Sequence, residues 1–308
     1  MSRLVTILVA LITIVPSVTS AAILYVNPTE GTYGLSDTFI ADIRIDNQRE
    51  CVNAAHVEVQ YPTDTLRAVD FSKGNSILSL WIEEPKIDTD TGTITFSGGI
   101  PGGYCGRIPG DPVLSNVLGK IVFSVIGAEK KNATVSITDA SALYLNDGTA
   151  TRASLTTQNA LYTISPTPLS SANPWLAQVG DDTIPPDEFV VTVESTRGVF
   201  RGNYYAVFST QDKQSGLDHY EIFERGSWRV VTSPHQLKDQ YLLGVQIKAI
   251  DKAGNERLGT YVEGSAPPRV PKESNYTVLL LVIASLLCLG VYMVYRDRKK
   301  KAAVDHSA

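Results

Sequence analysis

The sequence predicts an all-β fold, in which two β-sandwiches of unequal size precede one C-terminal transmembrane helix. Short segments with alternating apolar and polar residues occupy most of the 308-residue chain, and turn residues separate them. A Pro/Ser-rich stretch divides these segments into two groups. An uncharged stretch, long enough to span a membrane, follows the second group.

The first group of predicted strands lies within residues 21–164. In residues 38–46, Phe39, Ala41, Ile43 and Ile45 alternate with polar neighbours, which indicates one buried and one solvated face. The other predicted strands are 23–26, 55–61, 66–71, 77–82, 93–97, 120–126, 134–138, 142–145 and 161–164. About ten strands with turn signals between them favour a two-sheet antiparallel sandwich.

Residues 165–174 form a Pro/Ser-rich linker, which we expect to be extended and solvated. The second group of strands follows within residues 175–263. Its predicted strands are 189–193, 204–209, 218–224, 228–231 and 245–251. A unit of this length suits a small immunoglobulin-like or fibronectin-III-like sandwich. Residues 264–275, which are rich in proline, are predicted to be a stalk.

The two ends of the chain predict its location. Residues 1–20 resemble a secretory signal peptide, because a basic start is followed by a short apolar stretch and small residues; the alternative is a retained anchor. Residues 276–295 carry no charge and match the length of a transmembrane helix. The basic tail, 296–308, should stay cytoplasmic. We therefore expect a single-pass cell-surface protein with its N-terminal part outside.

Charge and composition exclude several function classes. The chain has 27 Lys+Arg and 32 Asp+Glu, and the middle of the chain is more acidic than the whole because basic residues gather at the ends. An acidic body without basic clusters is a poor phosphate binder, so nucleic acid is not an expected partner. The four His and three Cys lack metal-site spacing, so neither a metal nor a cofactor is predicted. No catalytic residues are predicted: Glu83 and Glu84 are adjacent and should point to opposite faces of a strand, and no nucleophile motif occurs. We expect no enzyme.

Five segments occur in a fixed order within residues 22–164: Ile23–Pro28, Val57–Pro62, Gly92–Ser97, Leu118–Phe123 and Leu145–Gly148. This ordered set resembles the cohesin domain of bacterial cellulosome-type and cell-surface proteins. The resemblance implies a jelly-roll-like sandwich and a non-catalytic receptor. One sheet face would dock a dockerin, which is a small calcium-loaded helical module on another protein. A weaker resemblance, at residues 215–221 and 248–255, relates the second unit to bacterial Ig-like domains.

Two cysteines depart from the cellulosomal pattern. Cys288 falls in the predicted membrane helix, which leaves Cys51 and Cys105 as an even pair outside the cytoplasm. Such a pair usually forms a disulfide, which would stabilise the fold by about 4 kcal/mol in the chain-entropy model. Two free thiols are the alternative.

Three residues are candidates for binding. The Gly/Pro-rich segment 98–110 is predicted to be a loop that carries Tyr104 and Arg107, residue types common at interfaces; a tethered connection is the alternative. Trp81 either stacks on a sugar ring or fills the sandwich core. Residues 88–92 begin like a calcium loop but lack its later ligands, so a hairpin turn is favoured.

Together these observations predict a membrane-anchored extracellular binding and scaffolding protein. Its first unit would dock a dockerin-like or other extracellular protein. The alternative is a carbohydrate-binding module that attaches the cell to polysaccharide, with Trp81 and Tyr104 as its platform.

Overall fold

The computed structural model describes residues 21–106, 116–127, 129–238 and 245–261. The predicted signal peptide, stalk, membrane helix and basic tail lie outside these residues, as does Arg107. Within the described part of the chain, no helix combines the length and the apolar character needed to cross a bilayer.

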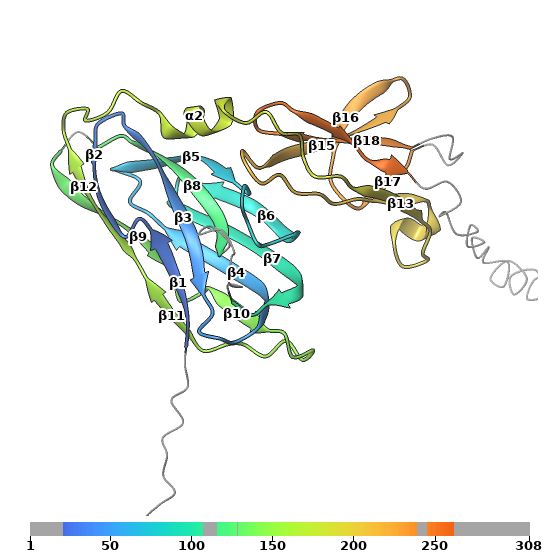
Figure 1. Ribbon diagram of the computed structural model, residues 1–308, viewed down its shortest axis with the longest axis horizontal. Helices are drawn as coiled ribbons and strands as arrows, with labels where there is room; N and C mark the ends of the chain where they lie inside the picture. Colours follow the sequence, from blue (N-terminus) through green and yellow to red (C-terminus); the bar gives the residue numbers. More distant parts are fainter. Residues whose placement is uncertain (1–20, 107–115, 128, 239–244, 262–308) are drawn as a thin grey trace, which may run out of the picture.

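The first module, strands β1 to β12, consists of two stacked sheets (Figure 1). The first sheet has the order β11 (Leu155–Gln158), β1 (Ala22–Asn27), β3 (Thr38–Asp46), β8 (Val117–Val125) and β5 (Leu66–Ser72). Strand β11 is parallel to β1, and the other neighbours are antiparallel. The predicted all-β sandwich is confirmed.

The second sheet of this module has the order β2 (Glu30–Gly34), β12 (Ala160–Ser165), β9 (Lys131–Ile137), β4 (Val52–Gln60), β7 (Thr93–Tyr104) and β6 (Leu80–Asp88). A short strand, β10 (Ala142–Leu145), also pairs with β4. Strand β6 is therefore an edge strand, and β7 lies between β6 and β4. The predicted loop at 98–110 is wrong in its first part, because β7 continues through the glycines to Tyr104.

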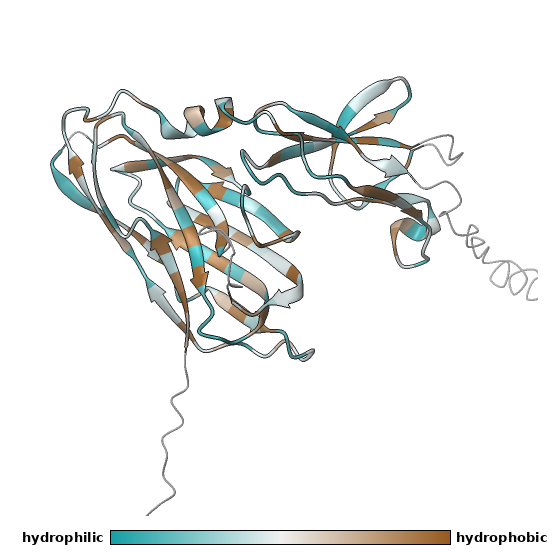
Figure 2. Cartoon of the chain, in the orientation of Figure 1, coloured by the Kyte–Doolittle hydropathy of each residue, from teal (hydrophilic) through white to brown (hydrophobic). Residues whose placement is uncertain are grey.

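The apolar side chains of both sheets meet between them. Phe39, Ala41, Ile43 and Ile45 of β3 are buried, as the alternation predicted. Figure 2 shows apolar and polar residues following one another along the strands of both modules. The predicted solvated side of β3 is wrong at Arg44, which is buried and pairs with Asp42 at 2.8 Å.

The second module, strands β13 to β20, contains two four-stranded sheets. One sheet has the order β17 (His235–Gln236), β14 (Tyr205–Val207), β13 (Val190–Glu194) and β20 (Thr260–Tyr261). The other has β16 (Ser227–Val231), β15 (Leu217–Glu224), β18 (Gln246–Asp251) and β19 (Glu256–Leu258). A separate core, which includes Val191, Phe208, Ile222 and Ile247, lies between them. A single 3₁₀ turn, η1 (Phe200–Gly202), connects β13 to β14.

The connection between the modules is bonded to the first one. The buried carboxylate of Asp37 accepts hydrogen bonds from the backbone amides of Leu169 and Ser170, at 3.2 and 3.1 Å. A short helix that the sequence did not predict, α2 (Pro174–Gly180), follows. The Asn173 side chain caps it by accepting from the amides of Trp175 and Leu176. The hydrogen bonds to Asp37 and the capped helix α2 hold the connecting segment in a defined position beside the first module.

The two modules also touch directly, side by side (Figure 1). The Ser72 hydroxyl donates to the Ser215 carbonyl at 2.7 Å, and the Gln211 amide donates to the Leu78 carbonyl at 3.1 Å. At Gly74, a Cβ atom would lie 2.3 Å from the Gln214 carbonyl oxygen, so only glycine fits this approach. The modules therefore meet through a specific polar contact.

Candidate functional site

The outer side of β4, β7 and β6 carries an ordered array of polar side chains. Because directly paired residues in adjacent strands point to the same side, the register places these side chains in rows. We call this array the outer face. It consists of His56, Glu58 and Gln60 of β4, Thr93, Thr95 and Ser97 of β7, and Glu83 and Lys86 of β6.

Hydrogen bonds connect the side chains within a row. His56 Nδ1 lies 2.7 Å from Ser97 Oγ, and the Ser97 hydroxyl donates to Glu83 Oε2 at 3.0 Å. Since the hydroxyl gives its proton to Glu83, His56 donates to Ser97 from Nδ1. In the row of Gln60, the Thr93 hydroxyl donates to Oε1 of that residue at 3.0 Å. These bonds hold exposed side chains in fixed positions, so little ordering entropy would be lost on docking.

Two apolar side chains lie at the edge of the outer face. Leu80 and Ile82 of the edge strand β6 are 52% and 69% exposed. Ile82 lies where the β6–β7 register shifts between Trp81 and Glu83. An apolar rim beside fixed polar groups is the composition expected of a protein-docking surface.

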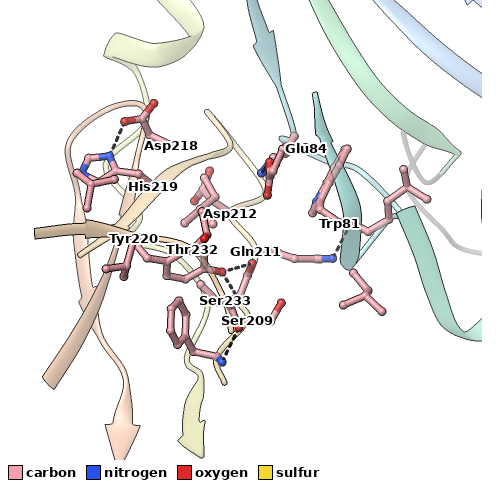
Figure 3. A pocket seen from close by; sticks show the side chains of 18 of the residues that line it. Trp81, Glu84, Ser209, Gln211, Asp212, Asp218, His219, Tyr220, Thr232 and Ser233 are labelled. Atoms are coloured by element: carbon pink, nitrogen blue, oxygen red, sulfur yellow. Dashed lines mark hydrogen bonds and ion pairs between the residues drawn. The ribbon is translucent and has the colours of Figure 1, made fainter. Parts of the chain in front are cut away.

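A cleft of about 510 Å³ adjoins this edge and separates the two modules. Figure 3 shows Trp81 and Glu84 of the first module on one side and His219, Tyr220 and Ser233 of the second on the other. The Tyr220 ring is packed against Phe208 in the wall of the cleft, and burial raises the pKa of its hydroxyl to about 12. Both modules therefore shape the surroundings of β6.

Trp81 packs inward as well as lining this cleft. Its ring lies 6.1 Å from that of Phe71 and 6.0 Å from that of Phe96, between ring centroids. The Lys73 ammonium lies 5.0 Å from the Trp81 ring centroid, and Lys73 also pairs with Glu84. Of the two interpretations of Trp81, this arrangement favours core packing, because a sugar ring would compete with Lys73 for the ring face.

Tyr104 lies elsewhere, beside the Cys51–Cys105 disulfide, which confirms the predicted pairing. It lines a separate hollow with Asn47 and Asn116, and no described residue of this hollow also lines the inter-module cleft. Trp81 and Tyr104 thus do not form one platform. Arg107, the third predicted binding residue, lies outside the described residues.

The two adjacent glutamates diverge, as the strand geometry predicted. Glu83 accepts from Ser97 on the outer face, whereas Glu84 pairs with Lys73 and lines the cleft. Residues 88–92 form a hairpin turn, in which Asp88 Oδ1 accepts from the amides of Asp90 and Thr91. The hydrogen bond from Thr91 is the main cause of the lowered pKa of Asp88.

The sequence offered a partial signal for the outer face. In the predicted strand 55–61, His56, Glu58 and Gln60 alternate with apolar residues, a pattern that predicts a solvated side for these three side chains. It did not reveal which strands flank β4, so Ser97, Thr95 and Glu83 were not recognised as part of one surface. The sequence also missed the group of Asp182, Asp212 and Asp251 in the second module, which the fold brings together.

Comparisons with known proteins give matches only among solved structures. No family model matches the chain, and no curated protein does. One match is a type I cohesin–dockerin complex from Clostridium thermocellum, 13% identical, covering 47% of this chain and 96% of that chain, with a TM-score of 0.38. A non-cellulosomal cohesin from the archaeon Archaeoglobus fulgidus is 14% identical, with 47% and 91% covered and a TM-score of 0.37. The sixth cohesin of Acetivibrio cellulolyticus scaffoldin B, in complex with a dockerin, is 13% identical, with 47% and 100% covered and a TM-score of 0.38. The matched structures are of the family that residues 22–164 resemble.

Proposed function

We propose that this chain is a binding and scaffolding protein whose cohesin-like first module docks a dockerin-like protein through the outer face. The observation that carries the proposal is the outer face itself, in which hydrogen-bonded polar rows border the exposed Leu80 and Ile82. A pre-ordered sheet surface of this kind suits docking by shape and polar complementarity. No covalent step is part of the proposed mechanism.

The location of the protein is also part of the proposal. Residues 276–295 would anchor the chain in a membrane, with residues 21–275 outside. A disulfide between Cys51 and Cys105 is compatible with an oxidising compartment. The second module, together with the predicted stalk, would then hold the outer face away from the membrane.

A binding panel tests the proposed partner. The full chain, kept in a mild nonionic detergent, is immobilised and probed with purified calcium-loaded dockerin modules, and the same preparation is applied to a glycan array. We expect saturable binding of at least one dockerin module and no glycan binding. Glycan binding without dockerin binding would favour the carbohydrate alternative, and binding of neither probe would overturn the proposed function.

A further inference from the structure

Three buried aspartates from separate segments meet in the second module. Asp182 follows α2, Asp212 lies in the connection between β14 and β15, and Asp251 ends β18. Their exposed fractions are 4%, 4% and 2%. One carboxylate oxygen from each lies within 4.8 Å of the other two.

The negative charge of this cluster has no basic partner among the described residues. None of their lysines, arginines or histidines forms an ion pair with any of the three carboxylates. Burial raises the pKa of Asp212, and the charges of Asp182 and Asp251 raise it further. Backbone amides contribute hydrogen bonds, such as Gly216 to Asp212 at 2.7 Å and Ser215 to Asp182 at 2.9 Å. Those dipoles do not neutralise three formal charges in a buried place.

A fourth oxygen in the cluster is unsatisfied. Ser215 is fully buried, and its hydroxyl has no hydrogen-bond partner among the described residues. Ser215 lies against the cluster, because its backbone amide donates to Asp182 Oδ2 at 2.9 Å. A buried hydroxyl without a partner costs stability, so this oxygen points to a ligand.

We propose that Asp182, Asp212, Asp251 and the Ser215 hydroxyl bind a calcium ion. Carboxylate and hydroxyl oxygens are ligands for a hard cation, and an irregular set from three segments suits the flexible coordination of Ca²⁺ better than the strict octahedron of Mg²⁺. The ion neutralises the three carboxylates and satisfies the Ser215 oxygen at the same time. Extracellular calcium sites typically bind in the range of about 10⁻⁴ to 10⁻³ M.

The position of the site connects it to the contact between the modules. The Ser215 carbonyl accepts from Ser72 of the first module at 2.7 Å. Lys252, the residue after Asp251, pairs with Asp70 of the first module at 2.7 Å. Calcium bound at this cluster therefore fixes the positions of Ser215 and of Asp251, the neighbour of Lys252, in the two segments that contact the first module.

Calcium titration of the full chain in nonionic detergent tests the site. After treatment with EDTA, the chain is titrated with CaCl₂ or MgCl₂, and binding is followed by calorimetry and by the Tm of unfolding. We expect one Ca²⁺ site in the second module, a higher Tm with Ca²⁺, and a smaller response to Mg²⁺. The absence of both calcium heat and a calcium-dependent Tm would overturn the proposal.

Three variants assign the binding to the cluster. Ser215→Ala removes a hydroxyl without a described partner, so a purely structural role predicts unchanged Ca²⁺ affinity, whereas we expect a loss of about tenfold or more. Asp212→Asn should abolish the calcium response without lowering the Tm in EDTA, because it relieves the repulsion. Asp181→Asn, a change at the exposed neighbouring aspartate, is the matched control and should respond as the parent does. The proposal is wrong if Ser215→Ala binds calcium as the control does, or if Asp212→Asn folds and binds calcium as the control does. If Asp212→Asn does not fold, the calcium affinity of Ser215→Ala alone decides.

Discussion

At the scale of single residues, Trp81 shows what a sequence leaves open. Its place in a predicted strand allowed either a sugar platform or a core side chain. The choice depends on Phe71 and Phe96, which come from β5 and β7 and reach Trp81 only through the fold. The ring is half-buried and packs against the core, so its main contribution is to stability.

The packing of Trp81 predicts a measurable loss of stability. Trp81→Ala should lower the free energy of unfolding of the first module by about 2 to 4 kcal/mol, because it removes an aromatic side chain from the contacts with Phe71 and Phe96. Urea unfolding followed by circular dichroism measures the change. Ile82→Ala, at an exposed neighbour, is the control and should shift the free energy by about 0.5 kcal/mol or less. Equal stability of the two variants would show that Trp81 is not a core residue.

At the scale of elements, strong alternation predicted strands well, and weak alternation did not. The segments at β3 and β4 were recognised because one side of each is apolar. Strand β2, with the sequence EGTYG, shows little apolar periodicity and exists because it pairs with β12. Helix α2 has a capping asparagine and a proline in its first turn, but seven residues are too few to show a helical period.

Strand β7 also shows how pairing overrides local composition. Glycine and proline in residues 98–103 indicated a loop, yet Gly98 and Gly99 pair with Ala55 and Ala54 of β4. Farther along, Tyr104 pairs with Val52, next to the Cys51–Cys105 disulfide. Cross-strand partners and a covalent bond thus extend a strand through residues of low strand propensity.

The disulfide is expected to contribute substantially to the stability of the first module. Replacing both cysteines, Cys51→Ser with Cys105→Ser, opens a bridge that spans a sequence separation of 54 and should cost about 4 kcal/mol in the chain-entropy model. Urea unfolding measures the loss, and treatment of the unaltered chain with a reductant should reproduce it. An unchanged unfolding midpoint in the double variant would contradict this assignment.

At the scale of the whole molecule, the sequence predicted two modules but not their contact. The linker composition indicated an extended chain, whereas Asp37 binds the linker backbone. The contact between Ser72 and Ser215 joins residues 143 positions apart, which no local pattern reveals. The candidate sites were only partly predictable because they also join residues that are far apart in the sequence. The sequence pattern predicted the solvated side of β4, but only the tertiary fold shows which strands flank it. The aspartate cluster likewise forms only in the folded chain.

The most direct test of the account measures how a dockerin module that binds the full chain responds to changes on either sheet, at constant calcium concentration. Thr95→Arg, at the centre of the outer face, and Ile82→Asp, at its rim, should each weaken binding at least about tenfold, whereas Val69→Asp, at an exposed apolar residue of β5 in the other sheet, should leave binding unchanged. Unaltered binding by Thr95→Arg and Ile82→Asp, or a loss only with Val69→Asp, would contradict the claim that the outer face docks the partner.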